Sequence, residues 1–183
     1  MNIFVVAGPP GIDKSTNAKE LIPVNVPIID QNLAAYQYKR NGFADYQDLA
    51  SLRSNQRIKE HLFGQQDFAL ELNLGFQSHY DYLKSIAYFD RSNQLHLLLF
   101  FTDDLRMCMD RARIRHLNGG HEVKPEVIEE MYGSTLRLFA EHKRMFSTIR
   151  LIDMTDSYFV EPNQASESLP DWIVNNDLKL HLA

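Results

Sequence analysis

The stretch that decides the fold is MNIFVVAGPPGIDKST, residues 1–16. Residues 3–7 are an unbroken apolar run that leads into the turn GPPG, residues 8–11, and KST, residues 14–16, begins a segment of helical character. A buried strand, a glycine-rich turn and a Lys-Ser pair at a helix N-terminus are the parts of the loop written G-x-x-x-x-G-K-[ST]. The stretch therefore predicts a strand–loop–helix unit that binds phosphate.

The residue types of this loop explain its chemistry. Gly8 and Gly11 let backbone N–H groups turn inward around a phosphate, and the helix N-terminus adds partial positive charge. Lys14 is placed to reach the terminal phosphates of a nucleotide, and the hydroxyl of Ser15, followed by Thr16, is placed to ligate Mg²⁺. Such loops occur in nucleotide kinases and ATPases, so the expected ligands are ATP and Mg²⁺.

One position departs from the motif. Asp13 stands where a glycine normally precedes the lysine, and the backbone there passes very close to the phosphates. An aspartate brings a Cβ atom and a negative charge toward a polyanion, and a charge at short range opposes the ligand. We therefore expect weak or absent nucleotide binding, unless the Asp13 side chain turns toward Lys14 or Mg²⁺.

Length and composition indicate an ordinary globular domain. The 183 residues are 44% apolar and 23% charged, which favours one domain, residues 1–183, with a core of its own. The net charge of −5 argues against a general nucleic-acid binder. The single cysteine, Cys108, lies among apolar residues and is interpreted as a buried small hydrophobe.

The same features predict the compartment. One cysteine forms no internal disulfide, which fits a reducing environment. No stretch approaches the roughly 18–20 apolar residues of a membrane span, and Met1-Asn2 lacks the basic region of a signal peptide. We expect a cytoplasmic protein without membrane contact.

Strand and helix patterns alternate along the chain. Strands are predicted at residues 3–7, 26–30, 68–74, 95–101 and 148–153, and helices at residues 14–22, 32–40, 46–63, 78–89, 105–117, 126–145 and 171–176. Residues 95–101 are apolar on nearly every position, which is typical of a central parallel strand covered on both sides. The fold class predicted is α/β, three layers with a mostly parallel sheet, and ligands of such sheets bind beyond the carboxyl ends of the strands.

Asp30 closes the second predicted strand, sixteen residues after Lys14. In a phosphoryl-transfer site, an aspartate there accepts the proton of the attacking hydroxyl. The alternative is an N-cap of the helix that follows, because aspartate is a good capping residue. Spacing alone leaves both roles open.

Glu71 lies inside the apolar strand at residues 68–74. A carboxylate buried in a strand is costly unless it is paired or bound to a ligand. It therefore either contacts the hydroxyls of an acceptor, supports Mg²⁺, or forms a structural ion pair, and a role in the site is slightly favoured.

Arginines crowd the helix predicted at residues 105–117, and Arg111 and Arg115 share one face because they are four residues apart. Two guanidinium groups that converge on phosphates would stabilise transition-state charge. The alternative is a solvated basic face balanced by Asp103, Asp104 and Asp110. Gly119-Gly120 follows the helix, and such a pair suits the hinge of a mobile lid, predicted over residues 111–131.

Four segments occur in one order, and together they resemble the short zeta-toxin-like P-loop kinases. They are GPPGIDKST at 8–16, IID at 28–30, FALELNL at 68–74 and RARIRHLNGGHEVKPEVI at 111–128. The resemblance covers residues 3–155, and the Gly-Gly-His segment is its most specific part. It implies a P-loop kinase fold, ATP and Mg²⁺ as cofactors, and a small-molecule hydroxyl as acceptor, with a nucleotide sugar as one candidate. In the family, an antitoxin protein holds the toxin members inactive.

The resemblance also implies roles for individual residues. Lys14 becomes the phosphate-binding lysine and Ser15 the Mg²⁺ ligand, while Asp30 becomes the base for the acceptor hydroxyl. Glu71 matches the strand glutamate that contacts substrate, and Arg115 matches a lid arginine. Further side chains expected to contact substrate are Arg111 and His121.

Three positions differ from the family pattern. Besides Asp13, the Thr-Thr that follows the strand glutamate is replaced by Leu72-Asn73, and the arginine before Tyr132 is Met131. Two hypotheses therefore stand: an ATP-dependent small-molecule kinase, or a degenerate P-loop protein that binds a partner without phosphate transfer. The first hypothesis is favoured by four intact residues, Lys14, Ser15, Asp30 and Glu71, and the second by the three departures.

Overall fold

The computed structural model describes residues 1–155, 160–163 and 168–182, and within these the strands form one parallel five-stranded sheet of order β2-β3-β1-β4-β5. The strands are β1 (Asn2–Ala7), β2 (Ile28–Ile29), β3 (Phe68–Leu72), β4 (Gln94–Phe101) and β5 (Thr148–Asp153). The predicted central strand, β4, lies between β1 and β5, so the parallel sheet is confirmed.

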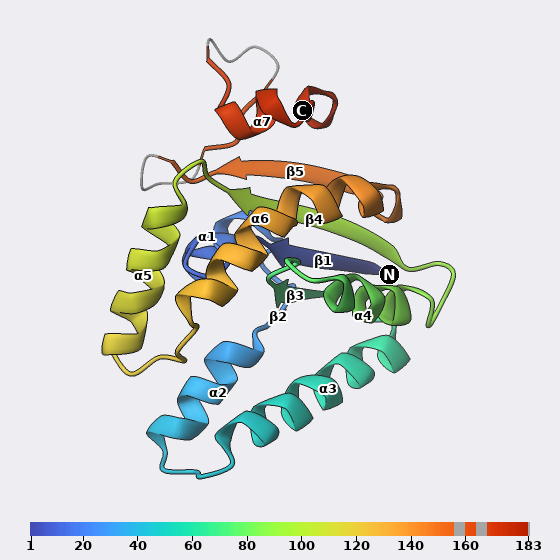
Figure 1. Ribbon diagram of the computed structural model, residues 1–183. Helices are drawn as coiled ribbons and strands as arrows, with labels where there is room; N and C mark the ends of the chain where they lie inside the picture. Colours follow the sequence, from blue (N-terminus) through green and yellow to red (C-terminus); the bar gives the residue numbers. More distant parts are fainter. Residues whose placement is uncertain (156–159, 164–167, 183) are drawn as a thin grey trace.

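The helices cover both faces of the sheet (Figure 1). They are α1 (Lys14–Leu21), α2 (Gln31–Arg40), α3 (Tyr46–Gly64), α4 (Gln77–Ala87), α5 (Leu105–Leu117), α6 (Pro125–His142) and α7 (Asp171–Asn175), with 3₁₀ turns at Lys143–Met145 and Lys179–His181. One apolar cluster joins α1 and α5 to the sheet, and another joins α3, α4, α6 and α7 to its opposite face. The predicted three-layer α/β fold is confirmed.

The side chains of β1 point alternately to the two faces of the sheet, and both faces are covered by helices, so the strand is apolar on both sides. Ile3 and Val5 are buried in the cluster with α3 and α4, whereas Val6 is buried in the cluster with α1 and α5. Successive side chains of a strand point to opposite faces, so a strand between two helical layers reads as a continuous apolar run. Residues 3–7 therefore specify the middle of the sheet as well as the start of the loop.

The register brings the ends of three strands together. Val6 of β1 lies beside Glu71 of β3, and Ile29 of β2 lies beside Leu70 of the same strand. Asp30 directly follows β2, and Gly8 directly follows β1. The predicted loop and both carboxylates therefore share the carboxyl edge of the sheet.

Several predicted element ends shift in the structure. Leu74 was expected in a strand, but β3 ends at Leu72 and Leu74 has a positive φ of 52°. The helix over residues 46–63 was expected to end at Gly64, yet Gly64 is its last helical residue and Gln65 takes the left-handed conformation, with a φ of 49°. The strand expected over residues 26–30 is paired only at Ile28–Ile29. These differences leave the order of elements unchanged.

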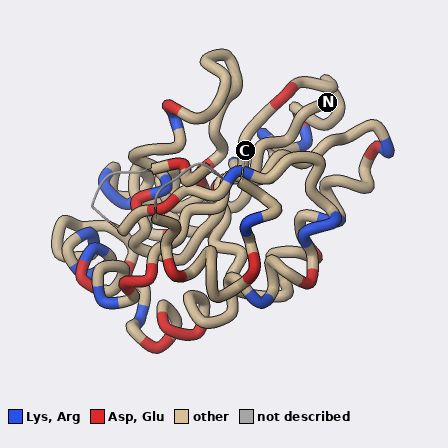
Figure 2. The backbone as a smooth tube through the Cα atoms, turned by 90° about the horizontal axis from the view of Figure 1, so that it is seen from above, with Lys and Arg blue, Asp and Glu red and all other residues tan. Residues whose placement is uncertain are grey.

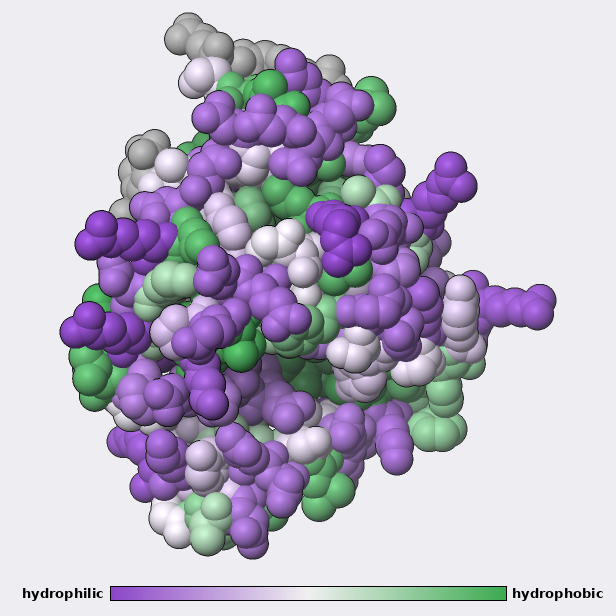
Figure 3. All heavy atoms as spheres, viewed as in Figure 1, coloured by the Kyte–Doolittle hydropathy of each residue, from purple (hydrophilic) through white to green (hydrophobic). Residues whose placement is uncertain are grey.

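Surface and interior follow the composition. Acidic and basic residues are interspersed around the backbone in Figure 2, and hydrophilic side chains cover most of the face in Figure 3. Cys108 is fully buried, and burial raises the pKa of its thiol to about 12, as expected of a small hydrophobe. Within the described ranges, no helix has both the length and the apolar run that a membrane crossing requires. Residues 156–159, 164–167 and 183 of the predicted single domain lie outside the description.

Candidate active site

Two glycines fit the loop tightly between β4 and α5. Gly8 has a φ of 143°, and a Cβ atom there would lie 2.3 Å from the carbonyl oxygen of Phe100. Gly11 has a φ of 82°, and its Cβ would lie 2.0 Å from the carbonyl oxygen of Cys108. Both glycines are therefore required by packing, in addition to any role in turning N–H groups toward a phosphate.

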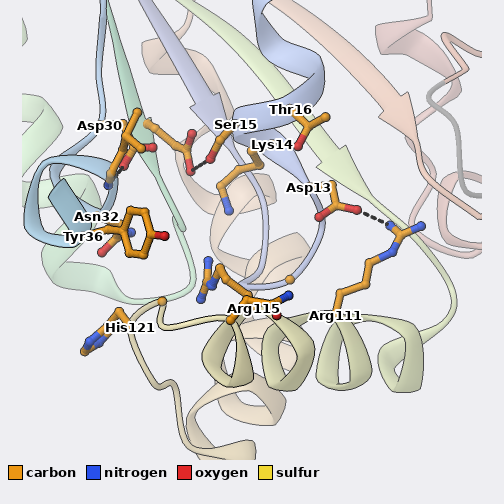
Figure 4. A pocket seen from close by; sticks show the side chains of 15 residues that line it. Asp13, Lys14, Ser15, Thr16, Asp30, Asn32, Tyr36, Arg111, Arg115 and His121 are labelled. Atoms are coloured by element: carbon orange, nitrogen blue, oxygen red, sulfur yellow. Dashed lines mark hydrogen bonds and ion pairs between the residues drawn. The ribbon is translucent and has the colours of Figure 1, made fainter. Parts of the chain in front are cut away.

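Asp13 pairs with Arg111 across the loop. Its backbone is left-handed, with φ 62° and ψ 34°, and its Oδ2 lies 3.2 Å from Nη1 of Arg111 (Figure 4). The guanidinium side chain is 20% exposed and that of Asp13 is 44% exposed. The cation that Asp13 contacts is Arg111 of α5, whereas Lys14 donates to other oxygens of the site. The added negative charge thus has an internal counter-charge.

Lys14 is buried at the first turn of α1 and is 5% exposed. Its Nζ donates to the carbonyl oxygens of Gly8 at 2.8 Å and Pro9 at 3.1 Å, and to Oδ1 of Asn73 at 3.0 Å. Burial lowers the pKa of Lys14 from 10.5, and the nearby carboxylate of Glu71 opposes that shift. The ammonium group is therefore held inside the loop by three oxygen acceptors.

Ser15 and Glu71 connect the loop to β3. The Ser15 hydroxyl donates to Oε1 of Glu71 at 2.9 Å, while Oε2 of Glu71 is buried without a hydrogen-bond partner. Burial raises the pKa of Glu71 above 4.5, and Lys14 limits the rise. An unpaired buried carboxylate oxygen is costly, so its position favours contact with a ligand.

Asp30 performs one of its two predicted roles in the structure itself. Its Oδ1 accepts a hydrogen bond from the backbone N–H of Leu33 at 3.0 Å, which makes it the N-cap of α2. The same side chain also lines the cavity that contains Lys14 and Glu71. Capping and a place in the site are compatible here, because the carboxylate has a second oxygen.

The glycine pair after α5 forms a helix cap. Gly120 donates to the carbonyl of Arg115 at 3.0 Å and Gly119 donates to that of His116 at 2.8 Å, with a φ of 89° at Gly119. This pattern is the Schellman motif that commonly ends helices. A Cβ on Gly120 would lie 2.8 Å from the Cγ of Arg115. The pair therefore fixes the chain beside Arg115, and the lid over residues 111–131 remains a prediction.

Met131 lies away from the cavity. It is 8% exposed and packs against Gly75, where a Cβ would come within 2.5 Å of the Met131 Cβ. The position that carries an arginine in the family pattern therefore belongs to the core between α6 and the segment after β3. An arginine here would place a charge at a position that is buried in this structure.

One cavity of about 400 Å³ brings the predicted residues together (Figure 4). The predicted residues on its wall are Gly11, Asp13, Lys14, Ser15, Thr16, Asp30, Glu71, Arg111, Arg115 and His121, whereas Gly8 is not part of the wall. In Figure 4 the side chains of Lys14 and Arg115 meet near its middle from α1 and α5, and the His121 ring lies at its edge. Burial and Arg115 lower the pKa of His121, which favours the neutral ring.

Sequence reasoning missed other residues of the cavity. In the sequence, Asn73 stood out only because it replaces a threonine of the family pattern. In the structure its amide oxygen accepts a hydrogen bond from Lys14. Tyr36 and Asn32 of α2 and Asn118 after α5 also line the wall. The position of Asn32 and Tyr36 just after Asp30, four residues apart on one helix face, was an available signal.

The residues at this edge fit a Mg²⁺ ion. The Ser15 hydroxyl and the Glu71 carboxylate provide oxygen ligands of the kind that Mg²⁺ prefers, and one of those oxygens is buried and unpaired. Mg²⁺ usually joins one or two protein ligands to substrate phosphates. Ser15 and Glu71 would hold the ion, which supplies neutralisation of phosphate charge when bound.

Comparisons with solved structures give the fold. Neither models of protein families nor curated proteins yield a match. The PezAT toxin–antitoxin structure of Streptococcus pneumoniae is similar over all of this chain and 76% of its own, with a TM-score of 0.59 at 16% identity. The AvrRxo1-ORF1:ORF2 complex with ATP is similar over 100% of this chain and 71% of the matched chain, with a TM-score of 0.61 at 12% identity.

A candidate kinase of Chloroflexus aurantiacus gives the same result. It is similar over 100% of this chain and 98% of its own, with a TM-score of 0.59 at 12% identity. At such identities the likeness concerns the fold. The chain has a three-layer α/β P-loop fold, which the PezAT and AvrRxo1 structures also have.

Proposed function

We propose that this protein is a phosphotransferase that uses ATP and Mg²⁺ to phosphorylate a hydroxyl group of a small molecule. The observation that carries the proposal is the composition of the cavity wall. Lys14, two carboxylates and Arg115 face one space at the carboxyl edge of a parallel sheet. That set supplies phosphate binding, a proton acceptor and stabilisation of transition-state charge.

The reaction assigns a task to each group. The acceptor oxygen forms a bond to the γ-phosphorus of ATP, the bond to the β–γ bridging oxygen breaks, and ADP leaves. Asp30 takes the proton of the acceptor hydroxyl through the carboxylate that lines the cavity. Lys14 and Arg115 stabilise the charge on the transferred group, while Glu71 and Ser15 hold Mg²⁺.

The Asp13–Arg111 pair makes nucleotide binding compatible with an aspartate in the phosphate loop. Without a partner, the Asp13 carboxylate would repel phosphates at short range. The Arg111 guanidinium at 3.2 Å compensates that charge. The compensation also occupies one of the two α5 arginines that line the cavity, which favours slow transfer.

A second candidate is a binding protein with a degenerate loop. The observation in its favour is that Arg111 is paired with Asp13 and Met131 is buried, which leaves Arg115 as the phosphate-directed arginine among the residues described. Loss of one arginine finger changes rates by about 10³–10⁵ in well-studied systems. Binding without measurable turnover is the form this candidate would take.

Two further features belong to the proposal. The chain shares its fold with proteins described in toxin–antitoxin and two-component complexes, so we include an antitoxin protein as a partner that covers the cavity. We also propose that the reaction takes place in the cytoplasm.

Calorimetry with ATP and Mg²⁺ tests the proposal. The wild-type chain and Asp13→Gly are compared with Lys14→Ala, which removes the buried ammonium. Binding by the first two proteins and its loss in Lys14→Ala supports the phosphotransferase. No heat from the wild-type chain with micromolar binding by Asp13→Gly would replace it by the degenerate-loop candidate for this sequence.

A further inference from the structure

A second cavity adjoins the first at its catalytic carboxylates. It has a volume of about 520 Å³, and four residues line both spaces: Ser15, Asp30, Leu33 and Glu71. The Ser15–Glu71 hydrogen bond therefore stands at the junction of the two cavities. A molecule that fills the second space would present its end to the groups that face the phosphate loop.

The second cavity differs from the first in chemistry. Its remaining wall comes from the end of α1 and the segment that leads into β2, and its apolar members are Ile22, Pro23, Val24, Val26 and Ile28. Lys19 is the one basic residue among the described residues of this wall. The first cavity, by contrast, carries Lys14, Arg111 and Arg115.

Val24 lies on the wall of the second cavity and is almost fully exposed to water. Its side chain is 99% exposed, although it lies between two prolines in a short connection. Contiguous apolar surface marks binding sites more often than single exposed apolar residues do, and Val24 shares this wall with Val26 and Ile28. Small-molecule sites have volumes of roughly 300–1,000 Å³, mostly apolar walls and a few polar groups that fix orientation.

We propose that this second cavity is the acceptor subsite and that it takes the apolar body of an uncharged alcohol. The inference rests on the proposed function and names its substrate class. The hydroxyl of the alcohol reaches Asp30 at the junction of the two cavities, while its hydrocarbon part lies against Val24, Val26 and Ile28. Transfer follows the bond changes given above, with the hydroxyl proton passing to Asp30.

Charge makes a nucleotide sugar a poor occupant of this space. A pyrophosphate group carries two negative charges, and buried charges need partners. Among the described residues of this wall, Lys19 is the one cation that could pair with the pyrophosphate, while the carboxylates of Asp30 and Glu71 would repel it. An uncharged alcohol meets no such repulsion, and its burial against aliphatic side chains contributes favourable free energy.

Titrations followed by methyl NMR test the subsite on the full chain. The probes are 1-hexanol, myo-inositol and UDP-N-acetylglucosamine. We expect 1-hexanol to shift the methyl signals of Val24, Val26 and Ile28, and the two polar probes to leave them unchanged. Shifts of these signals by UDP-N-acetylglucosamine, or no shift by 1-hexanol, would overturn the inference.

Two variants localise the effect. Val24→Asp adds a charge at a fully exposed position, so folding is preserved, and it should weaken 1-hexanol binding about tenfold. Val26→Phe fills the cavity and should weaken it similarly. The control is Leu180→Asp, because Leu180 is 84% exposed on a 3₁₀ turn away from the cavity and should leave the affinity unchanged. Equal effects of Val24→Asp and Leu180→Asp would contradict the location.

Nucleotide binding on the same samples separates the two proposals. Phosphorylation of 1-hexanol in the presence of ATP and Mg²⁺ supports both. Binding of ATP without any response to 1-hexanol overturns the acceptor subsite and leaves the phosphotransferase standing. Binding of 1-hexanol at Val24, Val26 and Ile28 without ATP binding removes the phosphotransferase and keeps the cavity as a site for apolar alcohols.

Discussion

The carboxylate of Asp13 lies 3.2 Å from the guanidinium of Arg111, so the phosphate loop and α5 are joined by an ion pair at the mouth of the cavity. The Arg111 N–H does not point along the line to the carboxylate, so the contact is Coulombic. Its partners are partly exposed, which limits its contribution to stability. The main effect of the pair is to reduce the negative charge of Asp13 that a bound phosphate would experience.

Removing the Asp13 charge should strengthen nucleotide binding. Asp13→Asn and Asp13→Gly both release Arg111 for the phosphates, and we expect each to raise the affinity for ATP and Mg²⁺ about tenfold in calorimetry. Asp13→Gly also relieves a left-handed φ of 62° and should raise the free energy of unfolding by about 1 kcal/mol. Unchanged affinity in both variants would show that the pair does not affect the ligand.

Arg111→Gln supplies the matched control for that result. In the wild-type background it leaves Asp13 uncompensated beside the phosphates and should weaken binding by more than tenfold. In the Asp13→Asn background the loss should be smaller, because no carboxylate remains to be compensated. Equal losses in the two backgrounds would mean that the two side chains act independently.

Glu71→Gln should change how stability depends on pH. Burial raises the pKa of Glu71 above 4.5, so between that value and the raised pKa the folded state binds more protons than the unfolded state. Wild-type stability therefore contains a contribution that is present at low pH and is lost as the pH rises through the raised pKa. The free energy of unfolding of Glu71→Gln minus that of wild type should grow with pH across this window. Urea titrations measure it, and a pH-independent difference would contradict the shift.

Gly11→Ala should disrupt the loop. The new Cβ would lie 2.0 Å from the Cys108 carbonyl oxygen at a φ of 82°, so the free energy of unfolding should fall by about 3 kcal/mol or more. Gly133→Ala is the control, since no heavy atom other than those of the chain neighbours and the adjacent backbone of α6 lies within 4 Å of its Cβ position. It should raise stability by roughly 0.5–1 kcal/mol. Thermal and urea unfolding followed by circular dichroism compare the two, and equal effects would refute the packing argument.

Met131→Arg should fail to restore an arginine clamp. Met131 is 8% exposed against Gly75, so a charged side chain there would be desolvated and should lower the free energy of unfolding by about 3 kcal/mol. Met131→Leu preserves volume and should change it by less than about 1.5 kcal/mol. A stable Met131→Arg protein with tighter ATP binding would contradict the assignment of this position to the core.

Much of the fold could be predicted because apolar periodicity reports which residues face a helical layer. Residues 95–101 read as a central strand since both of their faces are covered, and β4 occupies that place. The strand over residues 26–30 was less readable, because β2 is an edge strand with one partner and only Ile28–Ile29 pair. Pairing partners, rather than apolar content, set its length.

The candidate site was predictable where chemistry is local in sequence. Lys14 and Ser15 follow from the loop motif, and Asp30 follows from its place at a strand end. The contacts of Asp13 with Arg111 and of Lys14 with Asn73 join residues far apart in the chain, and no periodicity reports them. The apolar second cavity depends on how α1 and the segment before β2 pack, which composition does not encode.

Asp30 connects the proposed proton transfer to the anchoring of α2, because it both lines the cavity and caps that helix. The carboxylate that would receive the acceptor's proton also holds the first turn of α2 through the N–H of Leu33. Protonation removes the negative charge that interacts with the helix dipole, a contribution of about 0.3–1 kcal/mol. A proton on Asp30 would therefore weaken the N-terminal anchor of α2. Because Leu33 and Tyr36 of α2 line the cavity, the side chain that receives the proton also holds part of the wall that faces the substrate.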